Sequence, residues 1–547
     1  MLRNRRLFLA LVVLMVLALV ISGCGPKGEK LAKEINLNLS TEPPTADPGL
    51  QSDTTSGQVT ELLFLGLTDL DEKTLEVIPE LATKWTPSTD GLKWTFELRK
   101  DVFWVTYDPA AKKFTKQRAV NAHDVEYAVK RTLDPATASD YAYVLYKIKN
   151  GEEFNTGAIT DPNEVGVKAL DDWTVEFTLT EPAGFFPAIA GMWVCKPVAK
   201  ECVDQFGDKW TEPGNIWTNG PYAMATWEHE NKMIMVKNPH YYGAKAVSIE
   251  TINFSMVSEE STAFAMYENN ELDVCPVAPG DMDRVKADPK LSAELYSAPD
   301  LCTYYYGFNN TKPPFDNKLV RQAFSYAVDR QKLIDTVLKG GQKPAKTFAC
   351  PGIFGTPADD PNFKGISYDP AKAKQLLAQA GYPDGKGLPE VTLMFNTSQG
   401  HQKIAEFIQA SWKEALGVDV KLTNQEWKVY LKTVSEDAPQ IFRMGWCADY
   451  PDENNWVLEV FHSTKSDNPI KWSNAEFDQI VEQAAAESDP AKRKELYFKA
   501  EQILCVDEAG IIPIYYYVRN TCTKPWVERT YNPIGVEHVD KWKVKAH

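Results

Sequence analysis

The chain has 547 residues and a formal net charge of −16, and charged residues make up 24% of it. This acidic balance argues against nucleic acid as a partner, because polyphosphate backbones attract basic surfaces. The length exceeds what one hydrophobic core usually organises, so we expect two or three domains.

The N-terminus has the pattern of an export signal. Three arginines within the first six residues precede an apolar run from Leu7 to Ile21, which is shorter than the roughly 20 residues of a membrane span. The run ends in Ile-Ser-Gly-Cys at Cys24, which resembles the bacterial lipobox, where cleavage leaves a diacylated cysteine. We therefore expect residues 1–23 to be a signal peptide and residues 24–34 a tether. The exported protein would be held by its lipid at the outer face of the cytoplasmic membrane.

The first half of the body mixes strand and helix patterns. Ile35, Leu37 and Leu39 alternate with polar residues as a strand, and a short helix is expected near residues 57–65. Further strands are expected near 92–98, 173–179, 233–236 and 251–254, and a helix over 121–133. The change of character after residue 66 indicates an α+β insertion over residues 66–196.

The second half is typical of an α/β domain. A strand is expected near residues 303–308, and helices over 318–338 and 371–380, the latter with Asp369 as its cap. A strand at 391–395, a helix from about 402 to 416 and a strand at 418–422 predict a right-handed βαβ unit. A last strand is expected over 511–518.

Asp449 follows a largely apolar run, residues 441–448, that reads as a buried strand. Open α/β sheets bind ligands at the carboxyl ends of their strands, so this carboxylate would face a cleft. The sequence Asp-Tyr-Pro-Asp is also good turn chemistry, and spacing alone favours an ordinary turn. The acidic segment 449–455 lacks the glycine and alternating ligands of a calcium loop, so a solvated turn is expected there.

Motifs of catalysis, cofactor binding and metal binding are missing. Walker A, GxGxxG, HExxH and GxSxG do not occur, and the seven histidines show no metal-ligand spacing. The eight cysteines after Cys24 contain no CxxC pair. Export permits disulfides, so local pairs such as Cys195 with Cys202 or Cys505 with Cys522 stay open beside buried free thiols.

Over nearly the whole mature chain the sequence resembles the oligopeptide-binding proteins of bacterial ABC importers, the family 5 extracellular solute-binding proteins. The stretches that carry the resemblance are GVKALDDWTVEFTL at 166, FGDKWTEPGNIWTNGPY at 206, LCTYYYGFNN at 301, LVRQAFSYAVDR at 319, NQEWK at 424, GWCADY at 445 and IIPIYYYV at 511. The resemblance implies a two-lobed α/β fold of the periplasmic-binding-protein type II, with three domains, mixed sheets and a hinge. Domain I would comprise 35–65, 197–301 and 519–547, domain II 66–196, and domain III 302–518.

The same resemblance implies a peptide site. Asp449 would hold the α-ammonium group of a peptide, which agrees with the need of a buried ammonium for an opposite charge. The main chain at Gly445 and Cys447, with Thr54 on the other lobe, would pair with the extended peptide. The remaining implied roles are side-chain pocket walls at Trp427 and Trp446, ligand-lining tyrosines at Tyr141 and Tyr305, and contacts to the peptide's C-terminal carboxylate at His401 and Arg443.

A disulfide between Cys302 and Cys447 is also implied by the resemblance. Three positions depart from the family's charged pocket residues, because Gly307, Val434 and Leu338 carry no charge. Lys339, next to Leu338, would substitute if its helix were slightly rotated.

We therefore expect a monomeric binding lipoprotein without cofactor or metal. It would capture short peptides between closing lobes and deliver them to a membrane permease, and it would not be an enzyme. The alternatives are a same-fold receptor for a dipeptide, a cell-wall peptide, a sugar or a metal complex, a surface peptide-signalling receptor, and a secreted hydrolase.

Overall fold

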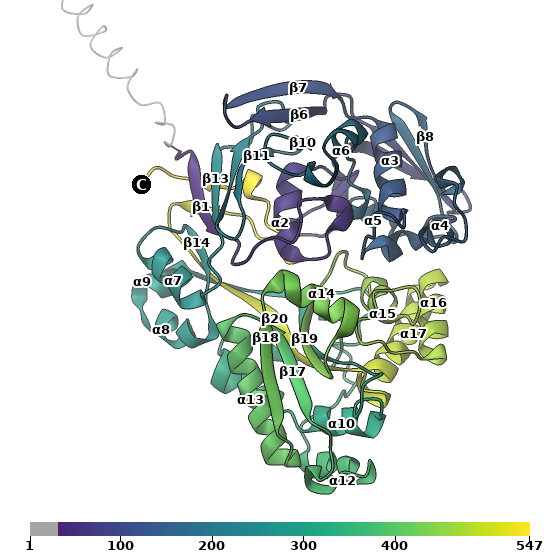
Figure 1. Cartoon of the computed structure of the whole chain (residues 1–547), viewed down its shortest axis with the longest axis vertical. Coiled ribbons are helices and arrows are strands. Elements are labelled where there is room, and N and C mark those ends of the chain that lie inside the picture. Colours follow the sequence, from purple (N-terminus) through teal and green to yellow (C-terminus); the bar gives the residue numbers. More distant parts are fainter. Residues whose placement is uncertain (1–30) are drawn as a thin grey trace, which may run out of the picture.

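The structure, a computed structural model, describes residues 31–547. The expected signal peptide, the lipidation site Cys24 and most of the tether lie outside the described residues. The molecule has two lobes, one above the other in Figure 1, each built around β-sheets with flanking helices. The predicted two-lobed α/β fold with mixed sheets is therefore confirmed.

The first lobe, the upper one in Figure 1, has a core of buried residues that come mainly from 35–254 and 527–544. Its central sheet has the strand order β1-β13-β12-β11, with β1 parallel to β13 and the other neighbours antiparallel. The alternation expected around Ile35 and Leu37 places both side chains in the core. The bounds are β1 Glu34–Asn38, β11 Tyr222–Glu228, β12 Lys232–Lys237 and β13 Thr251–Ser255.

Two larger sheets, several helices and the two-stranded sheet of β2 and β3 also belong to this lobe. One sheet has the order β4-β5-β9-β8 and the other β10-β6-β7. The helix expected over 121–133 is α3, and Asn121 caps it, because its side chain accepts hydrogen bonds from the first turn. The bounds are α2 Thr54–Leu63, β2 Thr68–Leu70, β3 Val77–Pro79, β4 Ala82–Pro87, β5 Lys93–Leu98, β6 Phe103–Asp108, β7 Lys113–Ala119, α3 Ala122–Leu133, α4 Gly151–Asn155, β8 Val167–Asp171, β9 Thr174–Thr178, α5 Phe186–Ile189, α6 Lys200–Phe206 and β10 Trp217–Thr218.

The second lobe is built on a sheet with the order β14-β20-β15-β19-β17-β18. β17, α13 and β18 form the predicted βαβ unit, and the two strands are parallel. Hydrophobic cores lie on both faces of this sheet, in line with the apolar character of its strands. The bounds are α10 Lys318–Tyr326, β16 Lys343–Pro344, α12 Pro370–Gln379, β17 Val391–Asn396, α13 Gln399–Leu416, β18 Val420–Gln425, α14 Trp427–Asp437, β19 Ile441–Cys447, α15 Asn454–Phe461, α16 Ala475–Ala486 and α17 Pro490–Gln502.

Two long antiparallel strands, β15 (Leu295–Phe308) and β20 (Ile511–Thr523), run from one lobe into the other. The domain boundaries expected at 301 and 518 fall inside these strands. Their pairing has irregularities between Pro299 and Thr303, near the point of crossing. Beside them lies a small group of elements with its own core, namely α7 Glu260–Glu268, β14 Val274–Pro276, α8 Met282–Ala287 and α9 Pro289–Glu294. The last strands are β21 Val527–Glu528 and β22 Lys543–Val544.

The prediction of one continuous helix over 318–338 is wrong, because the segment is divided after Tyr326. α10 ends at Tyr326, and the side chain of Asp329 caps a new short helix, α11 (Arg330–Leu333). The break lets the buried Arg330 donate through Nε to the carbonyl of Pro513 on β20, at 2.6 Å. This tertiary contact is not visible in the apolar periodicity of the segment.

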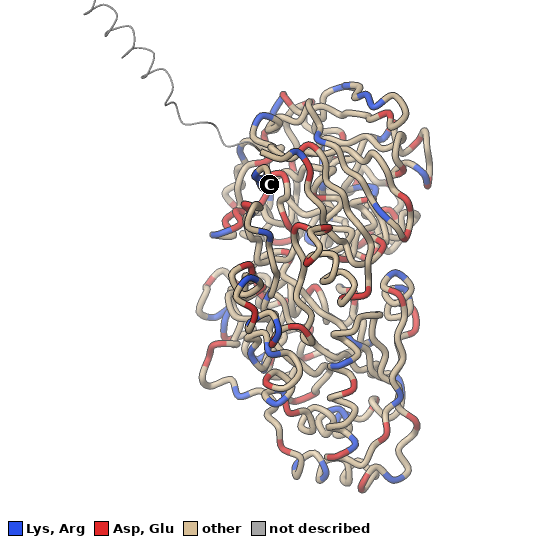
Figure 2. Tube along the Cα trace, turned by 90° about the vertical axis from the view of Figure 1, so that its left-hand side faces the viewer, with Lys and Arg blue, Asp and Glu red and all other residues tan. Residues whose placement is uncertain are grey.

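Charged residues of both signs are spread over both lobes in Figure 2. None of the helices within residues 31–547 is long and apolar enough to cross a membrane.

Candidate functional site

A cavity of about 330 Å³ lies between the lobes. It contains nine of the ten residues predicted to bind ligand, which are Thr54 and Tyr141 from the first lobe and Tyr305, Trp427, Arg443, Gly445, Trp446, Cys447 and Asp449 from the second. His401 lines an adjoining cavity of about 540 Å³, which shares Thr54, Cys447 and Tyr517 with the first. The predicted residues thus converge on one continuous region between the lobes.

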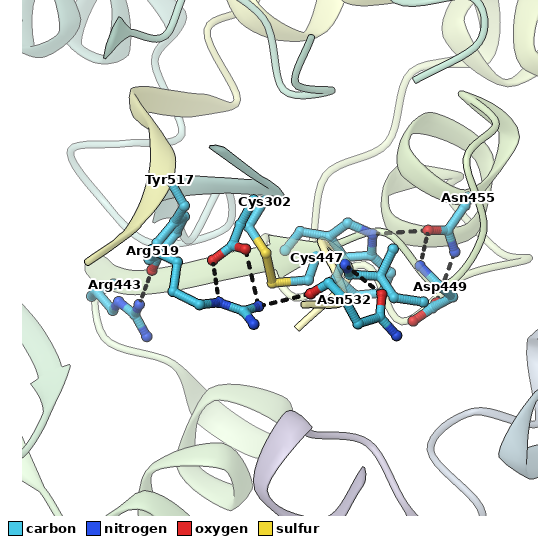
Figure 3. The surroundings of a disulfide bond; sticks show 11 residues. Cys302, Arg443, Cys447, Asp449, Asn455, Tyr517, Arg519 and Asn532 are labelled. Atoms are coloured by element: carbon cyan, nitrogen blue, oxygen red, sulfur yellow. Dashed lines mark hydrogen bonds and ion pairs between the residues drawn. A yellow bond between two sulfur atoms is a disulfide. The ribbon is translucent and has the colours of Figure 1, made fainter. Parts of the chain in front are cut away.

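Asp449 lies two residues beyond the end of β19, as its strand pattern indicates. Its backbone N–H donates to Asn455 Oδ1 at 2.9 Å, and Asn455 Nδ2 donates to Asp449 Oδ2 at 2.8 Å (Figure 3). Asn455 also donates to the buried carboxyl of Glu459 at 2.9 Å. The other oxygen, Asp449 Oδ1, has no hydrogen-bond partner among the described residues, and Asp449 lines the cavity.

Burial raises the pKa of Asp449 to about 8, and the neighbouring carboxyl of Glu459 adds to this while Asn455 opposes it. Burial likewise raises the pKa of Glu459 to about 7. Within residues 31–547 no lysine, arginine or histidine forms an ion pair with Asp449. The site is therefore a carboxyl group whose ionised form needs a cation that the protein does not supply.

The main chain next to Asp449 presents an open strand edge. β15 pairs with β19 along Ile441–Cys447, whereas β17 pairs with it only at Ile441 and Phe442. The N–H of Ala448 donates to Leu301 on the β15 side, so the backbone groups of Gly445 and Cys447 point the other way. That edge faces the cavity and is free to pair with an extended ligand.

Aromatic rings form the walls of the cavity and join the lobes. Tyr141 of the first lobe stacks on Trp446 of the second, with centroids 6.2 Å apart and an interplanar angle of 5°. Trp427 Nε1 donates to Asp53 Oδ1 of the first lobe at 3.2 Å. Tyr305 is fully buried and forms part of the floor. These contacts show that the two lobes are closed on each other.

Arg443 comes from the same strand and lines the first cavity, next to Tyr517, which lines both cavities. Its side chain is buried, donates to Asn396 Oδ1 at 3.2 Å and to the hydroxyl of Tyr517, and lies over the ring of Tyr304. Nε has no hydrogen-bond partner, and the residues that the structure describes include no carboxylate paired with this guanidinium. A buried, unpaired arginine is suited to an anionic ligand group.

His401 lies on the other side of the same tyrosine, with Nδ1 3.4 Å from the hydroxyl of Tyr304. Burial, followed by the charge of Arg443, lowers the pKa of His401 well below its ordinary value. This shift disfavours the protonated imidazole in the closed cleft, and the predicted contact of His401 with a peptide carboxylate stays a prediction. His401 can still act as a hydrogen-bonding group.

Cys302 and Cys447 face each other across β15 and β19 and form a disulfide, as the resemblance implies (Figure 3). It ties the crossing strand to the strand that carries the site. Beside it, Arg519 pairs with Asp300 at 3.0 Å and donates to the carbonyl of Asn532. The other cysteines within residues 31–547 are buried and free, so the alternatives of local pairs at 195/202 and 505/522 are wrong.

The three uncharged pocket positions have separate explanations. A Cβ atom on Gly307 would lie 2.4 Å from the ring of Phe442, so no side chain fits. Val434 lines the first cavity and Leu338 the second, and both leave these walls apolar. Lys339 does not substitute for them, because its ammonium group pairs with Asp283 outside both cavities.

Sequence reasoning missed the groups that support Asp449. The segment 452–455 is buried, which contradicts the expected solvated turn. Asp452 pairs with Arg493 at 2.8 Å, and Asn455 and Glu459 surround the site. The run of polar residues directly after the GWCADY stretch was the only signal, and it pointed equally to a surface turn.

One group of potential metal ligands occurs among residues 31–547, formed by Glu61, Asp69 and His538. Lys196 Nζ lies 2.6 Å from Glu61, and Lys541 Nζ lies 3.7 Å from Asp69. These ammonium groups balance the carboxylates, so the arrangement gives no reason to place a metal there.

Comparison with known proteins defines the class. Residues 76–468 match the bacterial extracellular solute-binding proteins, family 5. The periplasmic oligopeptide-binding protein OppA of Escherichia coli is 36% identical over 512 residues, which is 92% of this chain and 91% of that protein. OppA of Haemophilus influenzae in complex with RPPGFSPFR superposes with a TM-score of 0.85 at 30% identity, covering 94% of this chain and 100% of the other.

The Escherichia coli murein tripeptide-binding protein MppA provides a comparison of states. One of its structures superposes with a TM-score of 0.86 at 32% identity, covering 94% of this chain and 100% of MppA. Its unliganded open form gives 0.64, with coverage of 95% and 99%. The lobes of this chain are therefore not arranged as in that open form. Fold and site define a two-lobed solute-binding protein, and the chain belongs to the bacterial extracellular solute-binding proteins of family 5.

Proposed function

We propose that this protein is the substrate-binding lipoprotein of an ABC importer and captures short peptides between its lobes. The observation that carries the proposal is the combination of a buried carboxyl without a cation at Asp449 and an open strand edge beside it. A free peptide amine would satisfy the first and an extended peptide backbone the second. Arg443, at the far end of the cleft, would receive the terminal carboxylate. The relatives named for oligopeptides and murein tripeptide support this ligand class.

The proposed mechanism is capture by closure. The first lobe, with domains I and II as bounded above, would close on domain III by bending of β15 and β20, where the chain crosses. Contacts such as Trp427 with Asp53 would form only on closure. A sugar or a metal complex offers no ammonium group for Asp449, which disfavours those ligands. A role in peptide signalling would use the same cleft. It would differ from import only in the partner protein that binds the closed form.

The test is native mass spectrometry of the protein purified without denaturation, followed by release and sequencing of bound material. We expect a set of short peptides with free amines. Binding is then measured by calorimetry with tetra-alanine on protein stripped of ligand by unfolding and refolding. Recovery of only non-peptide ligands, and no heat with tetra-alanine, would contradict the proposal. Peptides recovered in cleaved form after incubation would favour the hydrolase alternative.

Anchoring and export are tested separately. We propose that Cys24 carries the lipid and that the protein delivers its peptide to the membrane permease of the importer. Labelling of cells with a fatty-acid analogue should mark the wild-type protein, and Cys24→Ser should remove the label and release the protein from the membrane. Labelling that persists in the variant would contradict the assignment.

A further inference from the structure

The small group formed by α7, β14, α8 and α9 is fixed to the first lobe. The N–H of Val257, shortly before α7, donates to Asn38 Oδ1 at 2.9 Å, and Asn38 Nδ2 donates to the carbonyl of Val257 at 2.9 Å. Directly before β14, Asp273 Oδ2 accepts the N–H of Asn36 at 2.7 Å. Asn36 and Asn38 belong to β1, in the central sheet of the first lobe. The small group therefore moves with the first lobe when the cleft opens or closes.

A contact with the second lobe starts from Glu260, the first residue of α7. Its Oε1 accepts the hydroxyl of Ser398 at 2.6 Å and the N–H of Gly400 at 3.4 Å. These two residues lie at the N-terminus of α13, in the second lobe. Beside them, the N–H of Ser261 donates to Gln399 Oε1 at 3.3 Å. The N-termini of α7 and α13 are thus joined across the two lobes.

Ser398 uses both hydrogen-bonding functions of its hydroxyl. As the N-cap of α13 it accepts the N–H of His401 at 3.2 Å. The cap uses only a lone pair of the oxygen, so the hydroxyl proton is free to be donated to Glu260. The carboxylate also lies at the positive end of the dipole of an 18-residue helix. A hydrogen bond to an ionised acceptor is stronger than one between neutral groups.

The carboxylate of Glu260 has its hydrogen-bond partners in the second lobe. Among residues 31–547 no lysine, arginine or histidine forms an ion pair with it, and only Ser398 and Gly400 donate to it. The other oxygen, Oε2, is buried and has no partner among the described residues. The burial of Oε2 offsets part of the gain, so the contact is expected to favour closure by a moderate amount.

The other contacts between the small group and the second lobe are more exposed. Lys339 pairs with Asp283, with side chains that are 34% and 70% exposed. Lys286 Nζ donates to the carbonyl of Lys339 at 2.6 Å, also at an exposed place. Exposed ion pairs contribute little, because water and salt screen them. The half-buried contact of Glu260 is therefore the one that can stabilise closure on this side.

We propose that Glu260 is an interlobe latch, whose bonds to Ser398 and Gly400 hold the lobes closed and slow the release of any bound peptide. The inference rests on the proposed function, because it names a residue that controls how long a captured peptide is retained. Glu260 is a positioning residue that acts through the second lobe. A contact present only in the closed form lowers the dissociation constants of all peptides by one common factor.

The experiment compares Glu260→Ala with wild-type full-length protein, both stripped of ligand. Calorimetry measures the affinities for tri-alanine, tetra-alanine and tri-lysine, and stopped-flow fluorescence of the cleft tryptophans Trp427 and Trp446 measures the rate of release. We expect the variant to bind all three peptides about three- to tenfold more weakly. The loss should come from faster release at an unchanged association rate, because the contact forms only on closure. Glu260→Gln keeps an acceptor for Ser398 without the charge and should give a smaller loss.

Two further variants separate the latch from other effects. Glu259→Gln is the matched control, because Glu259 is the neighbouring glutamate, is exposed and accepts only from Ser261 Oγ in the same segment. Ser398→Gly removes the hydroxyl while a glycine still serves as a cap, so it should give a loss similar to that of Glu260→Ala. The double variant Glu260→Ala/Ser398→Gly should lose no more than the weaker of the two single variants, since both remove one contact.

Unchanged or tighter binding in Glu260→Ala, a loss that differs among the three peptides, or an equal loss in Glu259→Gln would overturn the inference and leave the proposed function standing. Additive losses in the double variant would also overturn it. Failure of the wild-type protein to bind any of the three peptides would overturn the proposed function itself.

Discussion

The role of Asp449 can be tested by replacing it with asparagine, which keeps the shape and removes the charge. The pKa of this carboxyl rises from 3.8 to about 8 in the closed cleft. A shift of four pKa units means that ionising this carboxyl costs about 5 to 6 kcal/mol more in the cleft than in water. A peptide ammonium at the carboxylate would recover a large part of this free energy.

We therefore expect Asp449→Asn to weaken the binding of free-amine tetra-alanine by about 2 to 4 kcal/mol, or roughly 30- to 1,000-fold. N-acetyl tetra-alanine should bind the wild type weakly and the variant no worse. Calorimetry measures both peptides, and thermal unfolding confirms that the variant is folded. Equal affinity of the wild type for the two peptides, or an equal loss of both in the variant, would refute the reasoning.

Three further predictions concern the closed state and its support. Because closure raises the pKa of Asp449 from 3.8 to about 8, protonation favours the closed form fully below about pH 4, and this contribution is lost as the pH rises to about 8; small-angle scattering of ligand-free protein should show a larger radius of gyration at pH 8.5 than at pH 5. Replacing Cys302 and Cys447 by serine should lower the free energy of unfolding in urea by at most about 5 kcal/mol, since the disulfide closes a loop spanning 145 residues. Gly307→Ala should cost about 1 to 3 kcal/mol in the same assay, because its methyl group overlaps Phe442.

Local chemistry made most of the elements predictable. The strand alternation around Ile35, the cap at Asp369 and the βαβ pattern of residues 391–422 follow from short-range rules, and the structure has each of them with ends shifted by a few residues. The position of Asp449 after a buried strand was predictable for the same reason. The local rules could not decide whether Asp449 begins a turn or faces a cleft, because that depends on the other lobe.

The parts that could not be predicted depend on contacts between distant segments. The break after Tyr326 is stabilised by Arg330 reaching β20, which lies more than a hundred residues away in the chain. The lowered pKa of His401, on α13, results from its burial and from the charge of Arg443 on β19. Glu260 and Ser398 have no sequence pattern in common, and only the closed arrangement of the lobes brings them into contact.

The central claim is that the cleft binds a peptide by its amine and its main chain. A crystal structure of the stripped protein with tetra-alanine would test it most directly. We predict the peptide amine within about 3 Å of the Asp449 carboxylate, with backbone hydrogen bonds to Gly445 and Cys447 along the open edge of β19. A peptide bound in the reverse direction, or outside the cavity between the lobes, would contradict the account.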